Sequence, residues 1–261
     1  LEKELGVPIQ VLNKAGAGSQ VGVTEIAKSK PDGYTLGYVD MPTTVTIYLD
    51  AERQAAYSRK DLVPVALHAL SPGTFAVEAN SPYKTMKDIV DAAKAAPEKV
   101  KVGDPGILTL GHLTTLMVQK EANVKFANVH FEGGAPGMTA LLGGHIDAIS
   151  LIAADTAPRA KEGKARVLGV ADTQESRFLP GVKTMADQGY KVFTQTRTGM
   201  VAPGGTPKEI VDVLAAAMKK ICGSDAHITK MTDMLREVRY MDPQQYDAYW
   251  TELERQLPPL I

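Results

Sequence analysis

Short apolar runs alternate along this chain with stretches of helical periodicity, and this alternation restricts the fold more than any other feature of the sequence. Runs of this length predict buried strands, and the periodic stretches predict helices. Strands are expected at 7–12, 34–39, 63–70, 74–77, 100–102, 125–129, 146–152, 166–171 and 198–203. Helices are expected after Gly18 and at 110–121, 136–142 and 155–162. Strands separated by helices favour parallel βαβ units, so the sequence predicts an α/β protein.

Three helix starts are marked by a capping residue followed by an acidic or amide side chain. They are Thr85 with Asp88, Thr206-Pro207 with Glu209, and Asp242-Pro243 with Gln245. Residues 1–6 are typical of the last turn of a helix that ends at Gly6.

Two segments have the composition of passages between lobes. Residues 70–73 contain Ser-Pro-Gly ahead of a strand, and residues 198–205 lead from a strand into a Pro-Gly-Gly turn. If both segments are crossover strands between two lobes, the middle third of the chain forms one lobe and the two ends together form the other. We therefore expect lobe one at residues 1–72 and 201–261, and lobe two at residues 73–200.

Charge and cysteine content exclude several classes of partner. The 261 residues include 29 Lys+Arg and 30 Asp+Glu, so the formal net charge of -1 gives no overall attraction for nucleic acid. The single cysteine, Cys222, is expected to be a small buried side chain in a helix. No apolar run has transmembrane length, and a signal peptide cleaved ahead of residue 1 is compatible with this start.

The glycine-rich turn at 16–22 is the strongest local signal for a small-molecule site. Its sequence, GAGSQVG, follows an expected strand and opens an expected helix, as a dinucleotide-binding loop does. The third glycine lies one position too far along for that fingerprint, and Asp40 is not convincingly placed as the acidic partner. Two alternatives follow: a small α/β enzyme that holds a cofactor here, or an ordinary βα turn.

Two more loops lie where a strand gives way to a helix. Residues 103–109 contain Gly106 and place Thr109 to cap the next helix, and residues 40–44 follow the strand 34–39. Free N–H groups at a helix start bind anions, although an ordinary capped helix has the same sequence. Together the three loops predict a cleft for an anionic or hydrogen-bonding solute.

Patterns for catalysis are missing from the sequence. It contains no nucleophile elbow, phosphate-loop lysine, HExxH pattern or EF-hand spacing. The 5 histidines show no metal-ligand spacing, and only His145 with Asp147 forms a pair to consider. Structural or surface histidines are expected, and neither a metal nor a cofactor is predicted.

Several phrases resemble one family along almost the whole chain. VLNKAGAGSQVG at 11–22 and KPDGYTL at 30–36 carry its most specific pair of motifs. GGAP at 133–136, LLGGHID at 141–147, GK at 163–164 and APGGTP at 202–207 follow in the family's order. On these motifs the chain resembles the Bug-type solute-binding receptors of tripartite tricarboxylate transporters.

The resemblance implies a two-lobe type II periplasmic-binding (Venus flytrap) fold with a mixed, mostly parallel sheet in each lobe. It implies a monomeric periplasmic receptor that is not an enzyme and needs no cofactor. Such a receptor captures an organic acid, amino acid or amide, closes about a hinge, and presents the solute to membrane permease subunits. The rival hypotheses are the cofactor-using enzyme and a partner-docking module without a small-molecule site.

The family's site residues are carried over by position. They fall on the loops after strands 34–39 and 146–152 and on the loop ahead of the helix that contains His112. The ligand-binding residues that this implies are Asp40, Met41, Thr43, Gly106, Ile107, Leu108, Thr109, Leu151, Asp155 and Arg197.

Charge at these positions leaves the solute class open. Leu151 stands where family members often have an aspartate, and Asp40 stands where they have a small neutral residue. In one arrangement Arg197 neutralises Asp40 across the lobes. In the other, Asp40 accepts a hydrogen bond from a cationic or amide group of the ligand, and Arg197 binds the carboxylate of the ligand. A solvated turn is the third alternative for Asp40.

Overall fold

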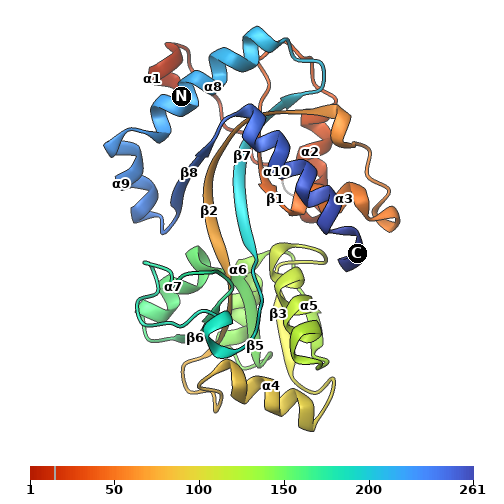
Figure 1. Cartoon of the computed structure of the whole chain (residues 1–261), viewed down its shortest axis with the longest axis vertical. Helices are drawn as coiled ribbons and strands as arrows, with labels where there is room; N and C mark the ends of the chain where they lie inside the picture. The colour runs from red at the N-terminus through yellow and green to blue at the C-terminus, as the bar shows by residue number, and fades with distance from the viewer. Residues whose placement is uncertain (15) are drawn as a thin grey trace. The chain divides into compact units, whose positions relative to one another are not determined.

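Two strands pass between two units of the chain and define its organisation. The computed structural model describes residues 1–14 and 16–261. Unit 1 comprises residues 1–70 and 197–261, and unit 2 comprises residues 71–196. Strand β2 (Leu62–Glu78) leads from unit 1 into unit 2, and β7 (Gln195–Pro203) leads back (Figure 1). Unit 2 is therefore one continuous segment inserted into unit 1.

Unit 2 contains a mixed sheet with the strand order β6-β2-β5-β3-β4. Strand β3 (Lys101–Asp104) pairs in parallel with both β4 (Ala127–His130) and β5 (Ala148–Ile152). Strand β2 is antiparallel to β5 and to β6 (Ala165–Val170). The helices of this unit are α4 (Met86–Ala95), α5 (Leu110–Ala122), α6 (Gly134–Leu142) and α7 (Ala153–Lys161).

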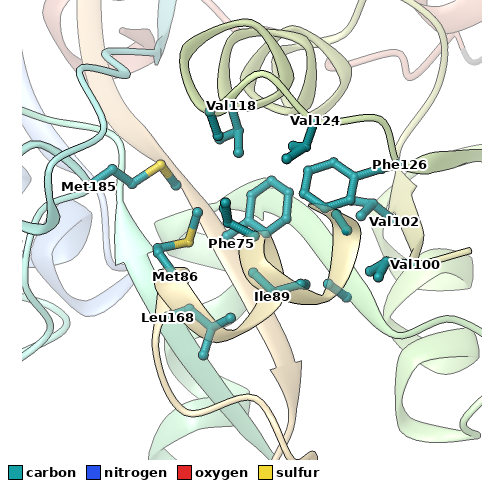
Figure 2. Close-up of a cluster of buried hydrophobic side chains, with 14 of the residues drawn as sticks. Phe75, Met86, Ile89, Val100, Val102, Val118, Val124, Phe126, Leu168 and Met185 are labelled. Carbon is teal, nitrogen blue, oxygen red and sulfur yellow. The ribbon is translucent and has the colours of Figure 1, made fainter. Parts of the chain in front are cut away.

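Apolar side chains from the sheet and from helices α4 and α5 form the core of unit 2. Figure 2 shows Phe75 beside Phe126, with ring centroids 5.8 Å apart, and Ile89 of α4 next to them. Val118 of α5 belongs to the same buried cluster. Full burial of such side chains contributes about 1.5 to 3 kcal/mol each, so this cluster stabilises the sheet of unit 2 against its helices.

Unit 1 contains a sheet with the order β1-β7-β2-β8. Strand β1 (Gly37–Met41) is antiparallel to β7, and β8 (Glu237–Met241) is antiparallel to β2. The helices are α1 (Glu2–Leu5), α2 (Gln20–Ala27), α3 (Thr43–Leu49), α8 (Lys208–Cys222), α9 (Asp225–Asp233) and α10 (Pro243–Gln256). Short 3-10 turns lie at 17–19, 51–53, 59–61 and 258–260 in unit 1 and at 186–188 in unit 2.

Helices α8 and α10 bury the apolar side chains of this second sheet. Val211 and Leu214 of α8 pack with Val65 of β2, and Cys222 at the end of α8 packs with Ala66. The side chain of Tyr246 from α10 lies against Gly199 of β7, where a Cβ would come within 2.7 Å of the tyrosine ring. Among the described residues, no helix combines the length and apolarity needed to span a membrane.

Most of the predicted elements are present in the structure. The capping boxes predicted at Thr85 and at Asp242 are confirmed, and Gly6 ends α1 in the left-handed conformation. The predicted strands at 63–70 and 74–77 form one continuous strand, β2. The expected lobe boundaries fall on β2 and β7, and the hypothesis that the two units close on a ligand stays a prediction.

The predicted strand at residues 7–12 and the predicted cap at Thr206 are wrong. Residues 7–12 form no strand, and Val11 and Leu12 are 79% and 63% exposed, because no described strand pairs with this segment. Thr206 does not cap α8, because its hydroxyl donates to the carbonyl oxygen of Pro203 at 2.7 Å and Pro207 occupies the N-cap position.

Candidate functional site

Three helices of unit 2 begin at the same edge of its sheet. Strands β5, β3 and β4 are parallel, so their carboxyl ends lie together, and α7, α5 and α6 follow them in turn. The first N–H groups of a helix have no partner within the helix, and the N-terminus carries a partial positive charge. This edge therefore presents several N–H donors, as sites for anions do in α/β folds.

Asp104, at the end of β3, anchors the first loop of this edge. Its side chain is fully buried, and its Oδ1 accepts a hydrogen bond from the N–H of Gly106 at 2.9 Å. The Nδ1 of His130, at the end of the neighbouring β4, lies 3.0 Å from both carboxylate oxygens. Burial raises the pKa of Asp104, and the hydrogen bonds from His130 and Gly106 oppose that rise. The carboxyl thus fixes the turn at Gly106, whose φ of 135° favours glycine.

Thr109 stands at the N-cap of α5 without capping it. Its hydroxyl donates to the carbonyl oxygen of Gly106 at 2.7 Å, so the predicted side-chain cap is wrong. The N–H of Leu108 donates instead to Nδ1 of His112, one turn into the helix, at 3.0 Å. The Thr109 hydroxyl closes the turn, and the His112 imidazole holds Leu108 within it.

His112 is a neutral ring with a defined tautomer. Burial and, to a smaller extent, nearby His130 together lower its pKa to about 4. Since Nδ1 accepts the Leu108 N–H, the ring proton must sit on Nε2. His112 therefore offers this edge an N–H donor and no charge.

The buried neutral state of His112 predicts a loss of stability in mild acid. An unfolded His112, with the ordinary pKa of 6.5, takes up a proton before the folded ring does, so its stabilising contribution is complete above pH 6.5 and falls as the pH drops toward 4. Between pH 7 and pH 5 this should cost about 2 kcal/mol. Urea unfolding followed by circular dichroism at both pH values checks it.

His112→Gln should reduce that pH dependence by the same amount, and His145→Gln, at an exposed histidine of unit 2, should leave it unchanged. Equal pH dependence in the wild type and His112→Gln would contradict the assignment.

Leu151 and Asp155 lie beside the start of α6. A Cβ on Gly134 would come 3.3 Å from Cδ2 of Leu151 and 3.4 Å from Oδ2 of Asp155. Leu151 is buried on β5, and its carbonyl oxygen accepts a hydrogen bond from the Thr74 hydroxyl at 2.9 Å. Asp155 is exposed in the first turn of α7, where a carboxylate interacts favourably with the helix dipole. Sequence reasoning placed both residues at this edge but did not include Gly134.

Asp40 lies on β1 of unit 1 in a chain of polar contacts. It pairs in register with Thr198 of β7, whose hydroxyl donates to Oδ1 of Asp40 at 2.9 Å. The same hydroxyl accepts a hydrogen bond from Nη1 of Arg236 at 3.3 Å. Arg236 thus contacts Asp40 through Thr198, and neither residue was expected from the sequence.

Arg197 is on β7 within the same unit as Asp40, not on an opposite lobe. It pairs with Met41, the neighbour of Asp40, so the side chains of Asp40 and Arg197 point to opposite faces of the β1–β7 pair. Its guanidinium lies 4.5 Å from the ring centroid of Tyr249 on α10. Thr43, 8% exposed at the start of α3, completes the predicted residues of unit 1.

The glycine-rich turn at 16–22 lacks the context of a cofactor loop. No strand precedes it in the described part of the chain, and Ala15 lies outside the described residues. The carbonyl oxygen of Ala17 accepts a hydrogen bond from Arg53 at 3.2 Å, and a Cβ on Gly18 would lie 3.3 Å from the same guanidinium. A dinucleotide loop must join a strand to a helix, and this turn does not follow a described strand. Packing against Arg53 accounts for the glycine at position 18.

A family model and several relatives match this chain. A model described as the tripartite tricarboxylate transporter family receptor matches residues 1–261. The protein of the gbd 5′ region of Cupriavidus necator is 33% identical over 267 residues, covering 99% of this chain and 78% of that protein. BugT of Bordetella pertussis is 28% identical, covering 82% of this chain and 66% of its own.

Solved structures match with similar coverage. A TctC solute-binding protein from Polaromonas has a TM-score of 0.77 at 28% identity, covering 99% of this chain and 88% of that one. BugD, described as a periplasmic binding protein, has a TM-score of 0.87 at 25% identity, with 99% and 87% covered. MatC from Rhodopseudomonas palustris, solved with bound malate, has a TM-score of 0.88 at 25% identity, with 99% and 89% covered.

The α/β fold with its inserted unit, and the helix N-termini gathered at the ends of parallel strands, are those of a solute-binding protein of the periplasmic-binding-protein class. Within that class, the family model spans the whole chain and a relative at 33% identity covers nearly all of it. The chain belongs to the tripartite tricarboxylate transporter receptor family. The resemblance inferred from its motifs is confirmed, and the comparisons do not favour the cofactor-using enzyme.

Proposed function

We propose that unit 2 binds a carboxylate of a small organic anion at the carboxyl ends of β5, β3 and β4. The observation that carries the proposal is the start of three helices, α7, α5 and α6, at this one edge. A helix N-terminus favours an anion by about 0.3 to 1 kcal/mol when exposed and by about 2 kcal/mol when partly buried. Three such ends, with the Nε2–H of His112, suit oxygens that accept several hydrogen bonds.

The proposed contacts of unit 2 are with the loop residues Gly106, Ile107, Leu108 and Thr109 and with Leu151 and Asp155. Malate, the ligand of MatC, and adipate, with which another Rhodopseudomonas palustris protein of this fold was solved, are small dicarboxylates. Dicarboxylates are therefore the first solutes to test.

From unit 1 we propose contacts with Asp40, Met41 and Thr43, whereas the side chain of Arg197 points to the face of the β1–β7 pair opposite to Asp40. The Asp40 carboxylate is exposed and would repel a simple dicarboxylate, whereas a cationic or amide group on the solute would donate to it. Amino acids and amides are for this reason the second group of solutes. Contact with Arg236 through Thr198 partly offsets the charge of Asp40, which keeps organic acids first.

We further propose that the receptor acts as a monomer in the periplasm and delivers its solute to the membrane permease subunits of the transporter. The family to which the chain belongs supports this role. Binding alone accomplishes it, without a cofactor or a chemical step.

A matching solute should raise the stability of the receptor by mass action. At a hundred times its dissociation constant the gain is about 2.7 kcal/mol. A thermal-shift screen of dicarboxylates, amino acids and amides identifies the solute, and titration calorimetry then measures the affinity of Thr109 variants. Thr109→Val should weaken binding roughly tenfold or more, because the Gly106 turn loses its hydroxyl support.

Thr109→Ser keeps the hydroxyl and should bind like the wild type. A screen without any shift would count against the receptor function, whereas equal affinity of folded Thr109→Val and wild type would remove only this loop from the site.

A further inference from the structure

Two histidines and the only cysteine of the chain meet inside unit 1. His68 lies on β2, Cys222 is the last residue of α8, and His227 is in the first turn of α9. One ligand atom from each residue lies within 4.8 Å of the others, and the two Nε2 atoms are 2.6 Å apart. Sequence spacing gave no sign of this group, which we call the His68 cluster, because its members are on three separate elements.

Strand and helix geometry explains the convergence. Ala66, two residues before His68 on β2, packs against Cys222 and Met218 of α8, and residues two apart on a strand share a face. His68 is therefore directed to the side of the strand on which α8 ends. The turn between Cys222 and Ser224, the N-cap of α9, brings His227 back over the same point.

The hydroxyl of Tyr38 contacts Nδ1 of His68 and so orients the ring. Metal-binding histidines usually donate their second ring N–H to an oxygen, which fixes the tautomer and leaves the other nitrogen as ligand. In the tautomer in which Nδ1–H donates to the phenol oxygen, the lone pair of His68 Nε2 faces His227. The Tyr38 phenol is therefore placed to orient His68 as a metal ligand without binding the metal itself.

We propose that the His68 cluster is a binding site for a thiophilic transition-metal ion such as Zn²⁺, ligated by Nε2 of His68, Nε2 of His227 and Sγ of Cys222. Two imidazoles and one thiolate suit Zn²⁺ and not Mg²⁺ or Ca²⁺, which take oxygen ligands. On binding, the Cys222 thiol releases its proton to solvent and a metal–sulfur bond forms.

The separation of the two imidazole nitrogens is close to the one that tetrahedral Zn²⁺ requires. With Zn–N bonds of about 2.0 to 2.1 Å, two histidine nitrogens lie roughly 3.3 Å apart. The rings need to separate by less than about 1 Å, which the half-buried His227 near the start of α9 can supply. Because His227 is only half-buried, water can reach the cluster from its side and take the fourth coordination position.

A thiolate is the form of cysteine that ligates a metal, so Cys222 is the one ligand of this set that brings a negative charge to the ion. We therefore expect Cys222 to be required for binding.

Zn²⁺ and Co²⁺ titrations of the full chain test the proposal. We expect one Zn²⁺ per chain by competition with a chromophoric chelator, and a thiolate-to-cobalt charge-transfer band with Co²⁺. Cys222→Ser and His227→Gln should each weaken Zn²⁺ binding at least about tenfold, and Tyr38→Phe should weaken it by about tenfold to a hundredfold. His145→Gln is the matched control at an exposed histidine and should bind like the wild type.

Cys222→Ser changes a buried residue, whereas His227 is half-buried, so the His227→Gln result stands even if the cysteine variant does not fold. No stoichiometric Zn²⁺ binding, a Co²⁺ spectrum without the thiolate band, or His227→Gln binding Zn²⁺ as the wild type does would each overturn the site. In that case His68 and His227 form only a hydrogen bond between neutral rings.

Discussion

Replacing Gly111 by alanine should destabilise unit 2 by about 3 kcal/mol and abolish solute binding. Gly111 lies in the first turn of α5, where a Cβ would collide with the carbonyl oxygen of Ser150 on β5 and come within 2.6 Å of Cδ of Pro105. The carbonyl is backbone and cannot swing away, so α5 must move. The loop from Gly106 to Thr109, which leads into α5, would move with it.

Far-ultraviolet circular dichroism during urea unfolding reports on the whole chain, and fluorescence of the single tryptophan, Trp250, reports on unit 1. The loss of stability in Gly111→Ala should appear in the circular dichroism signal, because Gly111 is in unit 2 and Trp250 is in unit 1. Gly223→Ala is the matched control, because its Cβ would have 3.4 Å to the nearest atom and its φ is ordinary. Wild-type stability and affinity in Gly111→Ala would show that α5 is not held against β5.

Trp250→Ala should lower the free energy of unfolding by about 3 to 5 kcal/mol. The indole is fully buried, and its Nε1–H donates to the hydroxyl of Tyr48 on α3 at 2.8 Å. The guanidinium of Arg59 lies 4.3 Å from the indole ring centroid. The substitution leaves a large cavity between α10 and α3, and it removes the donor to Tyr48.

Trp250→Phe separates these effects. It retains most of the ring and should cost about 1 to 3 kcal/mol, from the lost hydrogen bond and the smaller volume. Circular dichroism replaces fluorescence as the probe for both variants. A loss below about 1 kcal/mol in Trp250→Ala would mean that α10 is not part of the core of unit 1.

The sequence predicts elements well where local signals decide the conformation. The capping boxes at Thr85 and Asp242 depend on contacts within one turn, and both are confirmed. Helix α3 begins at the loop 40–44, where the sequence predicts a helix start, although its sequence, TTVTIYL, is rich in β-branched residues that favour strands. Burial of most of this helix outweighs that local preference.

In the candidate site too, local features are predicted from the sequence, and contacts between distant residues are not. The loop from Gly106 to Thr109 is visible in the sequence as a glycine turn ahead of a helix. The partnership of Asp104 with His130 depends on the parallel register of β3 and β4, in which these two residues are paired. The separation of Asp40 from Arg197 likewise depends on register, since a shift of one residue would put them on the same face.

Insertion of unit 2 within unit 1 sets an order on synthesis of the chain. Unit 2 has all its residues once position 196 has been translated, whereas β1 and the first half of β2 still lack β7 and β8. Unpaired strand edges are prone to intermolecular pairing. The nascent chain therefore carries an unfinished sheet at its N-terminal end until residue 241, the end of β8, has left the ribosome, and this is the interval in which a chaperone has most to protect.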